Sequence, residues 1–271
     1  MNKNTGTDKK HFVLEISGLT MEFGGIKALD DLDILVPRGE IAALIGPNGA
    51  GKTTFFNCVT GIYQPTAGTM HLSPDERTTH RLNGLKPNLV THCGLARTFQ
   101  NIRLFGKMTV LENVMIGHHC RTRATVLGAV LRNKRTRLEE QRIVESSYRL
   151  LKRIGLSDVI NEFAANLPYG AQRKLEIARA LATGPSLLLL DEPAAGMNPK
   201  ETADLDDFIR SLRDDGLSIL LIEHDMKLVM GLSKHIFVMD YGKKIAEGSP
   251  EEIRRNSDVI KAYLGEDVDD A

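Results

Sequence analysis

One glycine-rich stretch constrains this chain more than any other feature. Residues 41–45 are all apolar and predict a buried strand, while two phenylalanines at 55–56 open an apolar helix. The nine residues between them are Gly46, Pro47, Asn48, Gly49, Ala50, Gly51, Lys52, Thr53 and Thr54. A glycine-rich loop that ends in Lys-Thr, between a strand and a helix, is typical of a phosphate-binding loop.

The residue types in this loop suit a nucleoside triphosphate. Glycines let the backbone wrap closely around an anion and turn successive N–H groups toward it. The start of the helix adds the positive end of its dipole at the same place. Lys52 can then reach the β- and γ-phosphates, and the hydroxyl of Thr53 can bind Mg²⁺. The sequence therefore predicts a triphosphate site that uses Mg²⁺.

A second strong feature is a run of four leucines, 187–190, followed by Asp191, Glu192 and a proline. Four consecutive leucines predict a central strand that is buried on both faces. Open α/β sheets bind ligands at the carboxyl ends of their strands. In a chain with a phosphate loop, Asp191 is the natural partner of Mg²⁺ and Glu192 the natural base for water. The fold class that these features predict is α/β.

Two further side chains are candidates for the site. His224 follows the apolar strand 218–222, so it also stands at the carboxyl end of a strand. A lone histidine there is more often structural, but a γ-phosphate nearby would give it a role. Phe23 has an aromatic face that could stack on a nucleotide base. A half-buried strand residue explains Phe23 equally well.

The remaining segments predict a small sheet and several helices. Strands over 11–16 and 32–36, separated by a turn region at 18–25, predict an antiparallel sheet that leads into the phosphate loop. Residues 69–89 are polar, rich in Pro and Gly and poorly periodic, and they predict hairpins and loop. We expect Val259, Ile260, Tyr263 and Leu264 to pack on one face of the last helix.

Three surface features remain open between two interpretations. A loop with Ile102, Leu104 and Phe105 could be a docking surface. The basic stretch 121–153 is either a solvated helix face or a contact for anionic lipid or an acidic partner. The helix that starts at Tyr169 and Gly170 could offer backbone N–H groups to a phosphate, although a plain helix start explains it too.

The overall composition limits the partners of the chain. It is 42% hydrophobic and 26% charged, as in an ordinary globular protein, and its formal net charge is +0. A neutral chain is not attracted to nucleic acid as a whole, so we expect no nucleic acid partner. Residues 1–10 lack the apolar core of a signal peptide, and no apolar run approaches the roughly 18 residues that span a bilayer. A membrane-spanning part would have to come from another chain.

These motifs, in this order, resemble the nucleotide-binding subunits of ATP-binding cassette (ABC) transporters over nearly the whole chain. The resemblance implies a P-loop NTPase core with an antiparallel β-subdomain and an α-helical signature subdomain. It predicts one nucleotide-binding domain over residues 11–265, with the helical subdomain at about 95–183. Residues 1–10 and the acidic residues 266–271 would be disordered tails.

The resemblance also implies a role for each motif residue, with ATP as the nucleotide. Gly46 to Thr53 match the Walker A loop, and residues 187–191 match Walker B. The other implied roles are adenine stacking for Phe23, Mg²⁺ binding by Thr53, Gln100 and Asp191, and catalysis by Lys52, Glu192 and His224. Three loops are also implied. Gln100 is the glutamine of the Q-loop, residues 167–172 with Tyr169 and Gly170 form the signature, and residues 195–198 form the D-loop.

A finer resemblance, to the ATPases of high-affinity branched-chain amino acid importers, is carried by residues 96–105, 191–196 and 258–265. It implies an ATPase at the cytoplasmic face of a bacterial cell membrane. The implied partners are a second ABC ATPase subunit in a heterodimer, two transmembrane permease subunits and a periplasmic or extracellular solute-binding protein. No amino acid would bind to this chain itself.

Three alternatives to this function remain. An importer ATPase for urea or short-chain amides is a close relative. A lipid or drug exporter ATPase would have the same fold. A non-transport ABC ATPase of DNA repair or translation usually has two cassettes or a long coiled coil, whereas this chain has one cassette and no sustained heptads.

The signature departs from the common Leu-Ser-Gly-Gly-Gln pattern. Pro168 stands in place of the serine, Tyr169 in place of a glycine and Ala171 in place of the glutamine. Proline removes both the hydroxyl and a backbone N–H. The D-loop likewise ends in Asn198 rather than Asp. Our hypothesis is that the composite site that uses this chain's signature is the weaker of two.

Overall fold

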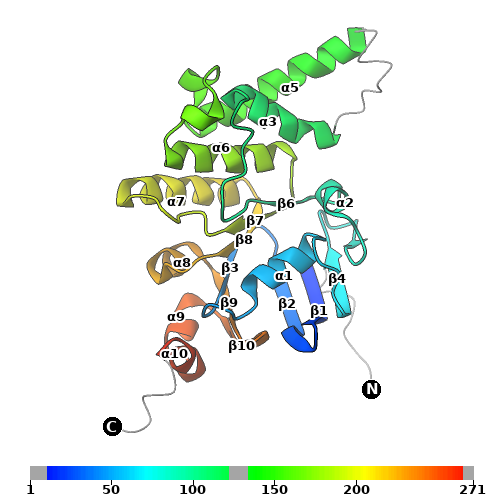
Figure 1. The fold of residues 1–271 in the computed structure, drawn as a ribbon, viewed down its shortest axis with the longest axis vertical. Helices are drawn as coiled ribbons and strands as arrows, with labels where there is room; N and C mark the ends of the chain where they lie inside the picture. Colours follow the sequence, from blue (N-terminus) through cyan, green and yellow to red (C-terminus); the bar gives the residue numbers. More distant parts are fainter. Residues whose placement is uncertain (1–10, 122–133, 265–271) are drawn as a thin grey trace.

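A computed structural model of the chain describes residues 11–121 and 134–264. Two β-sheets with α1 make up its centre, helices α3, α5 and α6 lie together at one end, and α9 and α10 lie at the other (Figure 1). The predicted tails, 1–10 and 266–271, and part of the basic stretch, 122–133, lie outside the described residues.

The first sheet is antiparallel, with strand order β2-β1-β4-β5. Its strands are β1 (Phe12–Phe23), β2 (Ile26–Pro37), β4 (Ala67–Leu72) and β5 (His80–Arg81). The sequence predicts this sheet, but the prediction of a turn region at 18–25 is wrong. Strand β1 continues through it, because register shifts between Ile16 and Met21 absorb the irregular Gly18, whose φ is 61°. The turn is confined to residues 24–25.

The second sheet has the order β10-β9-β3-β8-β7-β6. Its strands are β3 (Ile41–Ile45), β6 (Leu95–Arg97), β7 (Leu187–Asp191), β8 (Ser218–Ile222), β9 (His235–Asp240) and β10 (Lys243–Gly248). All are parallel except β10, which forms a hairpin with β9. Every residue of β3, β7 and β8 is buried, as their apolar runs predict.

Two hydrophobic clusters cover the two faces of this second sheet. One lies between the two sheets and includes Phe55 and Phe56 of α1. The other packs the opposite face against the helices and includes Leu175, Leu205 and Val229. Alternate residues of β3, β7 and β8 point into the two clusters. Because these strands are parallel, their carboxyl ends lie at the same edge of the sheet.

The helices begin and end near the signals in the sequence. They are α1 (Lys52–Val59), α2 (Pro87–His92), α3 (Val110–His118), α5 (Lys134–Arg153), α6 (Tyr169–Ala182), α7 (Pro199–Asp214), α8 (Met226–Leu232), α9 (Pro250–Arg254) and α10 (Ser257–Leu264), with short 3-10 turns at His119–Arg121, Ser157–Val159 and Ala164–Asn166. Capping boxes start three of them, at Thr109, Asn198 and Ser249. In the segment predicted as hairpins and loop, the last residues form the first turn of α2 instead.

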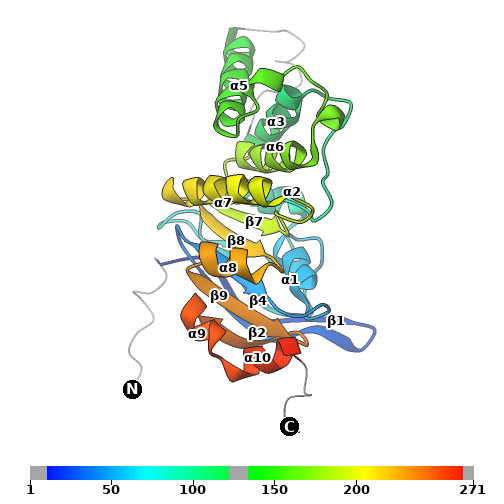
Figure 2. The same ribbon diagram turned by 90° about the vertical axis from the view of Figure 1, so that its left-hand side faces the viewer.

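The prediction for the last helix is wrong in part. Val259 is buried, but Ile260 and Tyr263 of α10 are 45% and 42% exposed. Figure 2 shows the reason, since α10 lies at the outer end of the molecule beside α9. Helical periodicity identifies an apolar face but does not say whether another element covers it. The side chain of Leu264 lies outside the described residues.

The loop with three large apolar groups is also less exposed than its composition suggests. Leu104 packs against the hydrophobic cluster under the helices, and Ile102 is half-buried. Phe105 is exposed, with the guanidinium of Arg179 over its ring.

In the described residues, helix α5 continues the basic stretch from Lys134 to Arg153. None of the helices in 11–121 and 134–264 is long and apolar enough to cross a membrane.

Candidate functional site

The phosphate loop joins β3 to α1 and owes its shape to two glycines. A Cβ on Gly46 would lie 2.1 Å from the carbonyl oxygen of Met239, and one on Gly51 would lie 2.6 Å from that of Ala28. Every other residue type carries a Cβ and would clash, so the backbone can approach its neighbours this closely only because both positions are glycine. Gly51 is also the N-cap of α1, with a φ of 102°. The loop therefore presents the first turn of α1 toward the centre of the site.

The ammonium of Lys52 lies inside this loop. Its Nζ donates hydrogen bonds to the carbonyl oxygens of Gly46 at 2.6 Å and of Pro47 at 2.9 Å. Burial lowers the pKa of Lys52, and the nearby carboxylates of Glu192 and Asp191 act in the opposite direction. A cation held in a ring of backbone groups at a helix start is a strong site for anionic oxygens.

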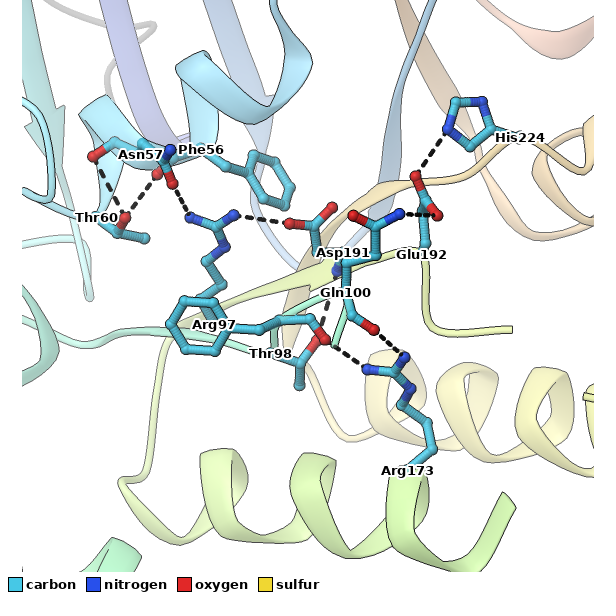
Figure 3. A network of polar contacts seen from close by, with 11 residues as sticks. Phe56, Asn57, Thr60, Arg97, Thr98, Gln100, Arg173, Asp191, Glu192 and His224 are labelled. Carbon is cyan, nitrogen blue, oxygen red and sulfur yellow. Dashed lines mark hydrogen bonds and ion pairs between the residues drawn. The ribbon is translucent and has the colours of Figure 1, made fainter. Parts of the chain in front are cut away.

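Asp191 ends strand β7 and is almost fully buried. Its Oδ2 accepts a hydrogen bond from Nη2 of Arg97 at 2.7 Å, and Nη1 of Arg97 donates to Oδ1 of Asn57 at 2.7 Å (Figure 3). The guanidinium also lies 5.2 Å from the ring centre of Phe56 and 5.1 Å from that of Phe99. No local sequence pattern indicates Arg97, because its partners Asn57 and Asp191 are distant in the chain.

Two other predicted site residues, Gln100 and His224, meet at the carboxylate of Glu192. Nε2 of Gln100 donates to its Oε2 at 2.8 Å, and Nε2 of His224 lies 2.8 Å from its Oε1 (Figure 3). Glu192 has a φ of 47°, which is rare for a residue other than glycine. Its own N–H donates to the carbonyl oxygen of Ile222 on the neighbouring strand, and this bond holds it in place. The strained backbone places its carboxylate between the other two side chains.

These residues border one cavity. A cavity of about 320 Å³ is lined by the phosphate loop from Asn48 to Thr54 together with Gln100, Glu192 and His224. Residues that the sequence predicts as one site thus share a cavity in the structure. The cavity combines backbone N–H groups, one ammonium and a carboxylate, which suits a polyphosphate and an attacking water.

The residues present fit Mg²⁺. A threonine hydroxyl at Thr53, a buried carboxylate at Asp191 and the amide oxygen of Gln100 are all hard oxygen donors. Within residues 11–121 and 134–264, no cluster of three His, Cys, Asp or Glu side chains could hold a metal ion alone. Mg²⁺ usually binds through one or two protein carboxylates plus the phosphates of a substrate.

Six predicted site residues do not line this cavity: Gly46, Pro47, Asp191, Phe23, Tyr169 and Gly170. Phe23 ends β1 at the edge of the molecule, 43% exposed, and its ring meets Tyr63 edge-on with centroids 5.4 Å apart. The side chain of Phe23 is thus partly exposed, as base stacking requires. Tyr169 and Gly170 start α6 in the helical region, with Pro168 as an N-cap that makes no side-chain hydrogen bond. Tyr169 is 44% exposed there, while Gly170 is buried against the side chain of Glu201.

Arg173 of α6 is a fully buried arginine that was likewise not predicted from the sequence. Nη1 and Nη2 donate at 2.6 Å to the carbonyl oxygens of Phe99 and Gln100 respectively, and Nη1 also pairs with Glu176 at 2.9 Å. Arg173 and Glu176 are opposite charges three residues apart on an otherwise apolar helix face. Such a pattern is a sequence signal for a buried ion pair.

Comparisons with known proteins agree with this geometry. Residues 29–195 match the family described as ABC transporter, and residues 243–269 match the family described as branched-chain amino acid ATP-binding cassette transporter. The chain is 49% identical over 255 residues to the high-affinity branched-chain amino acid transport ATP-binding protein LivG of Salmonella typhimurium. It is 47% identical to the corresponding protein BraF of Pseudomonas aeruginosa. Each match covers 94% of this chain and 98% of the relative.

Solved structures give the same result for the fold. A nucleotide-free ATP-binding cassette from an ABC transporter superposes with a TM-score of 0.80 at 32% identity, over 94% of this chain and 100% of the other. The ADP conformation of MJ1267, an ATP-binding cassette of an ABC transporter, superposes with a TM-score of 0.78 at 31% identity, over 94% and 99% of the two chains. The expected ABC ATPase fold is confirmed.

Proposed function

Because the chain belongs to the ATP-binding proteins of ABC transporters, in their branched-chain amino acid type, we propose that its ATP hydrolysis powers the import of leucine, isoleucine and valine. It is an ABC transporter ATPase. One observation supports a working site above all others. At the phosphate-loop cavity, the carboxylate oxygens of Glu192 lie 2.8 Å from Nε2 of Gln100 and 2.8 Å from Nε2 of His224.

The phosphates of ATP bind to the loop from Gly46 to Thr54. Backbone N–H groups and the ammonium of Lys52 offset the charge of the β- and γ-phosphates, and Phe23 stacks on the adenine. Thr53, Gln100 and Asp191 would hold Mg²⁺, which supplies further positive charge at these phosphates. In phosphoryl transfer, positioning and electrostatic stabilisation of this kind dominate catalysis.

Glu192 orients the attacking water and accepts its proton. The carboxylate already accepts a hydrogen bond from Gln100, so its own orientation is fixed before water arrives. His224 lies at the other carboxylate oxygen and holds the γ-phosphate. A positioned base typically contributes on the order of 10²–10⁴ in rate.

The complete site requires a second chain. Tyr169 and Gly170 are absent from the cavity around this chain's own phosphate loop, which supports their use by another subunit. The second chain is a different ABC ATPase subunit, and the two form a head-to-tail heterodimer. Two permease subunits and a solute-binding protein complete the importer. This chain then works at the cytoplasmic face of a bacterial cell membrane.

The transported solute is tested with the intact complex. The transporter is purified through a tag on this chain, reconstituted in ATP-loaded proteoliposomes, and supplied with the solute-binding protein encoded in the same gene neighbourhood. We expect ATP-dependent uptake of radiolabelled leucine, isoleucine and valine, and none with the Glu192→Gln complex. Uptake of urea or acetamide without uptake of these amino acids would contradict the proposed substrate.

A further inference from the structure

Arg173 is a buried link between α6 and the loop that carries Gln100. Its guanidinium donates to two consecutive carbonyl oxygens of that loop, those of Phe99 and Gln100, at 2.6 Å each (Figure 3). Hydrogen bonds from a charged donor are stronger than neutral ones, and a low dielectric strengthens them further. The fork of Arg173 therefore fixes the backbone of Gln100, whose side chain reaches Glu192.

The partner of this arginine fixes the other end of the same loop. Oε2 of Glu176 accepts from Nη1 of Arg173, while its Oε1 accepts from the backbone N–H of Arg103 at 3.2 Å. The side chains of Arg173 and Glu176 are 0% and 1% exposed. A buried ion pair is tolerated when further hydrogen bonds offset its desolvation, and in this pair Nε of Arg173 is the atom left without a hydrogen-bond partner. Both members here also bind the loop over residues 99–103, which attaches it to α6 at two points.

On its other side, Arg173 contacts the signature segment. Nη2 donates to the hydroxyl of Tyr169 at 3.3 Å, and the guanidinium carbon lies 5.9 Å from the centre of the tyrosine ring. The same ring borders Gly196, where a Cβ would lie 3.4 Å from Cε1 of Tyr169. One buried side chain thus joins the loop of Gln100 to Tyr169, and through Tyr169 to the segment 195–198.

We propose that Arg173 is a positioning residue that makes the backbone of Gln100 and the signature segment move as one unit. A rearrangement of Gln100 at the nucleotide site is then passed to Tyr169 and Gly196. Without Arg173 the two segments respond independently. This inference rests on the role proposed above for Gln100 at the nucleotide site.

The test measures hydrogen exchange by mass spectrometry in the purified transporter complex, with and without a non-hydrolysable ATP analogue and Mg²⁺. Peptides that cover 97–105 and 166–174 report on the two segments. The variant is Arg173→Met with Glu176→Met, because removing both charges leaves no unpaired buried charge. Arg173→Lys keeps the charge but loses the fork. Lys174→Met, next to Arg173 and with only a loose 3.9 Å contact to Asp204, is the matched control.

We expect the nucleotide analogue to change the exchange of both peptides in the native chain and in Lys174→Met. In the double variant only the 97–105 peptide should respond, and in Arg173→Lys the response of 166–174 should be reduced. A joint response in the double variant equal to the native one would overturn the proposal for Arg173. No response of the 97–105 peptide in the native chain would instead overturn the role of Gln100 at the nucleotide site, and the inference with it.

Discussion

The guanidinium of Arg97 lies 2.7 Å from the carboxylate of Asp191, and each of the two side chains is only 6% exposed. Arg97 comes from β6 and Asp191 from the end of β7, so the pair joins neighbouring strands at the carboxyl edge of the sheet. A second bond from Arg97 reaches Asn57 on α1. The pair therefore ties the helix after the phosphate loop to the strand that ends in Asp191.

Arg97→Gln should lower the free energy of unfolding by about 3–5 kcal/mol, because breaking a buried pair leaves the Asp191 charge uncompensated. Arg97→Lys, which keeps the charge, should lose less. Urea unfolding measures both. Lys234→Ala is the control, because its pair with Glu40 is exposed and such pairs are worth ~0–1 kcal/mol. A loss for Arg97→Gln no larger than that of the control would contradict this role.

Arg97 also shows which parts of the site the sequence predicts. Lys52 and Asp191 are each indicated by a short local pattern, a glycine loop or an apolar strand that ends in carboxylates. Arg97 and Arg173 act on residues about 75 to 95 positions away, such as Asp191 and Phe99, and no local pattern encodes such a contact. The sequence therefore predicts the groups that are proposed to touch the nucleotide better than those that hold these groups in place.

The same distinction applies to the fold. Strands β3, β7 and β8 are buried on both faces and are predicted in full by their apolar runs. Strand β1 is longer than predicted, because pairing with both β2 and β4 carries it across Gly18. Long-range strand pairing overrides the local turn signal of a glycine there.

Lys52→Ala should weaken ATP binding roughly tenfold to a hundredfold, the amount expected for one lost hydrogen bond to a charged group. The reason is that its ammonium lies inside the loop, bonded to the carbonyl oxygens of Gly46 and Pro47, where the phosphates are proposed to bind. Titration with a fluorescent ATP analogue measures the change. Lys200→Ala, at an exposed position on α7, is the matched control. Equal affinity for the two variants would remove Lys52 from the phosphate site.

Pro168→Ser should raise the ATPase rate of the assembled transporter, if the signature of this chain forms the weaker of two composite sites. Serine at this N-cap should add about 1 kcal/mol of helix stability, and loss of the proline should remove ~0.4–1 kcal/mol, so the fold stays nearly as stable. Pro168→Ala lacks the hydroxyl and is the control. A lower or unchanged rate in Pro168→Ser would contradict the hypothesis.

Glu223 should give the fold a distinctive pH dependence. Burial raises its pKa above the ordinary 4.5, although the N–H groups of Ala194 and His224 act in the opposite direction. The folded state then binds the proton more tightly than the unfolded state. This contribution to stability is present below pH 4.5 and is lost as the pH rises through the raised pKa.

Glu223→Gln keeps an acceptor for Ala194 but cannot titrate. The free energy of unfolding of the native chain, minus that of this variant, should therefore fall as the pH rises from about 4.5 through the raised pKa of Glu223. Urea unfolding at several pH values measures it, with Glu251→Gln as a control at an exposed carboxylate. A difference that rises with pH would show that the N–H groups, and not burial, dominate.

The most direct test of the site is Glu192→Gln in the assembled transporter. The amide keeps the shape of the side chain but cannot accept a proton from water. We therefore expect ATP to bind as in the native chain, while the hydrolysis rate at this site falls by at least about 100-fold, the typical worth of a positioned base. Single-turnover measurement with radiolabelled ATP bound to the complex separates the two steps. ATP that stays bound and intact would agree with Glu192 as the base, and hydrolysis at a near-native rate would contradict it.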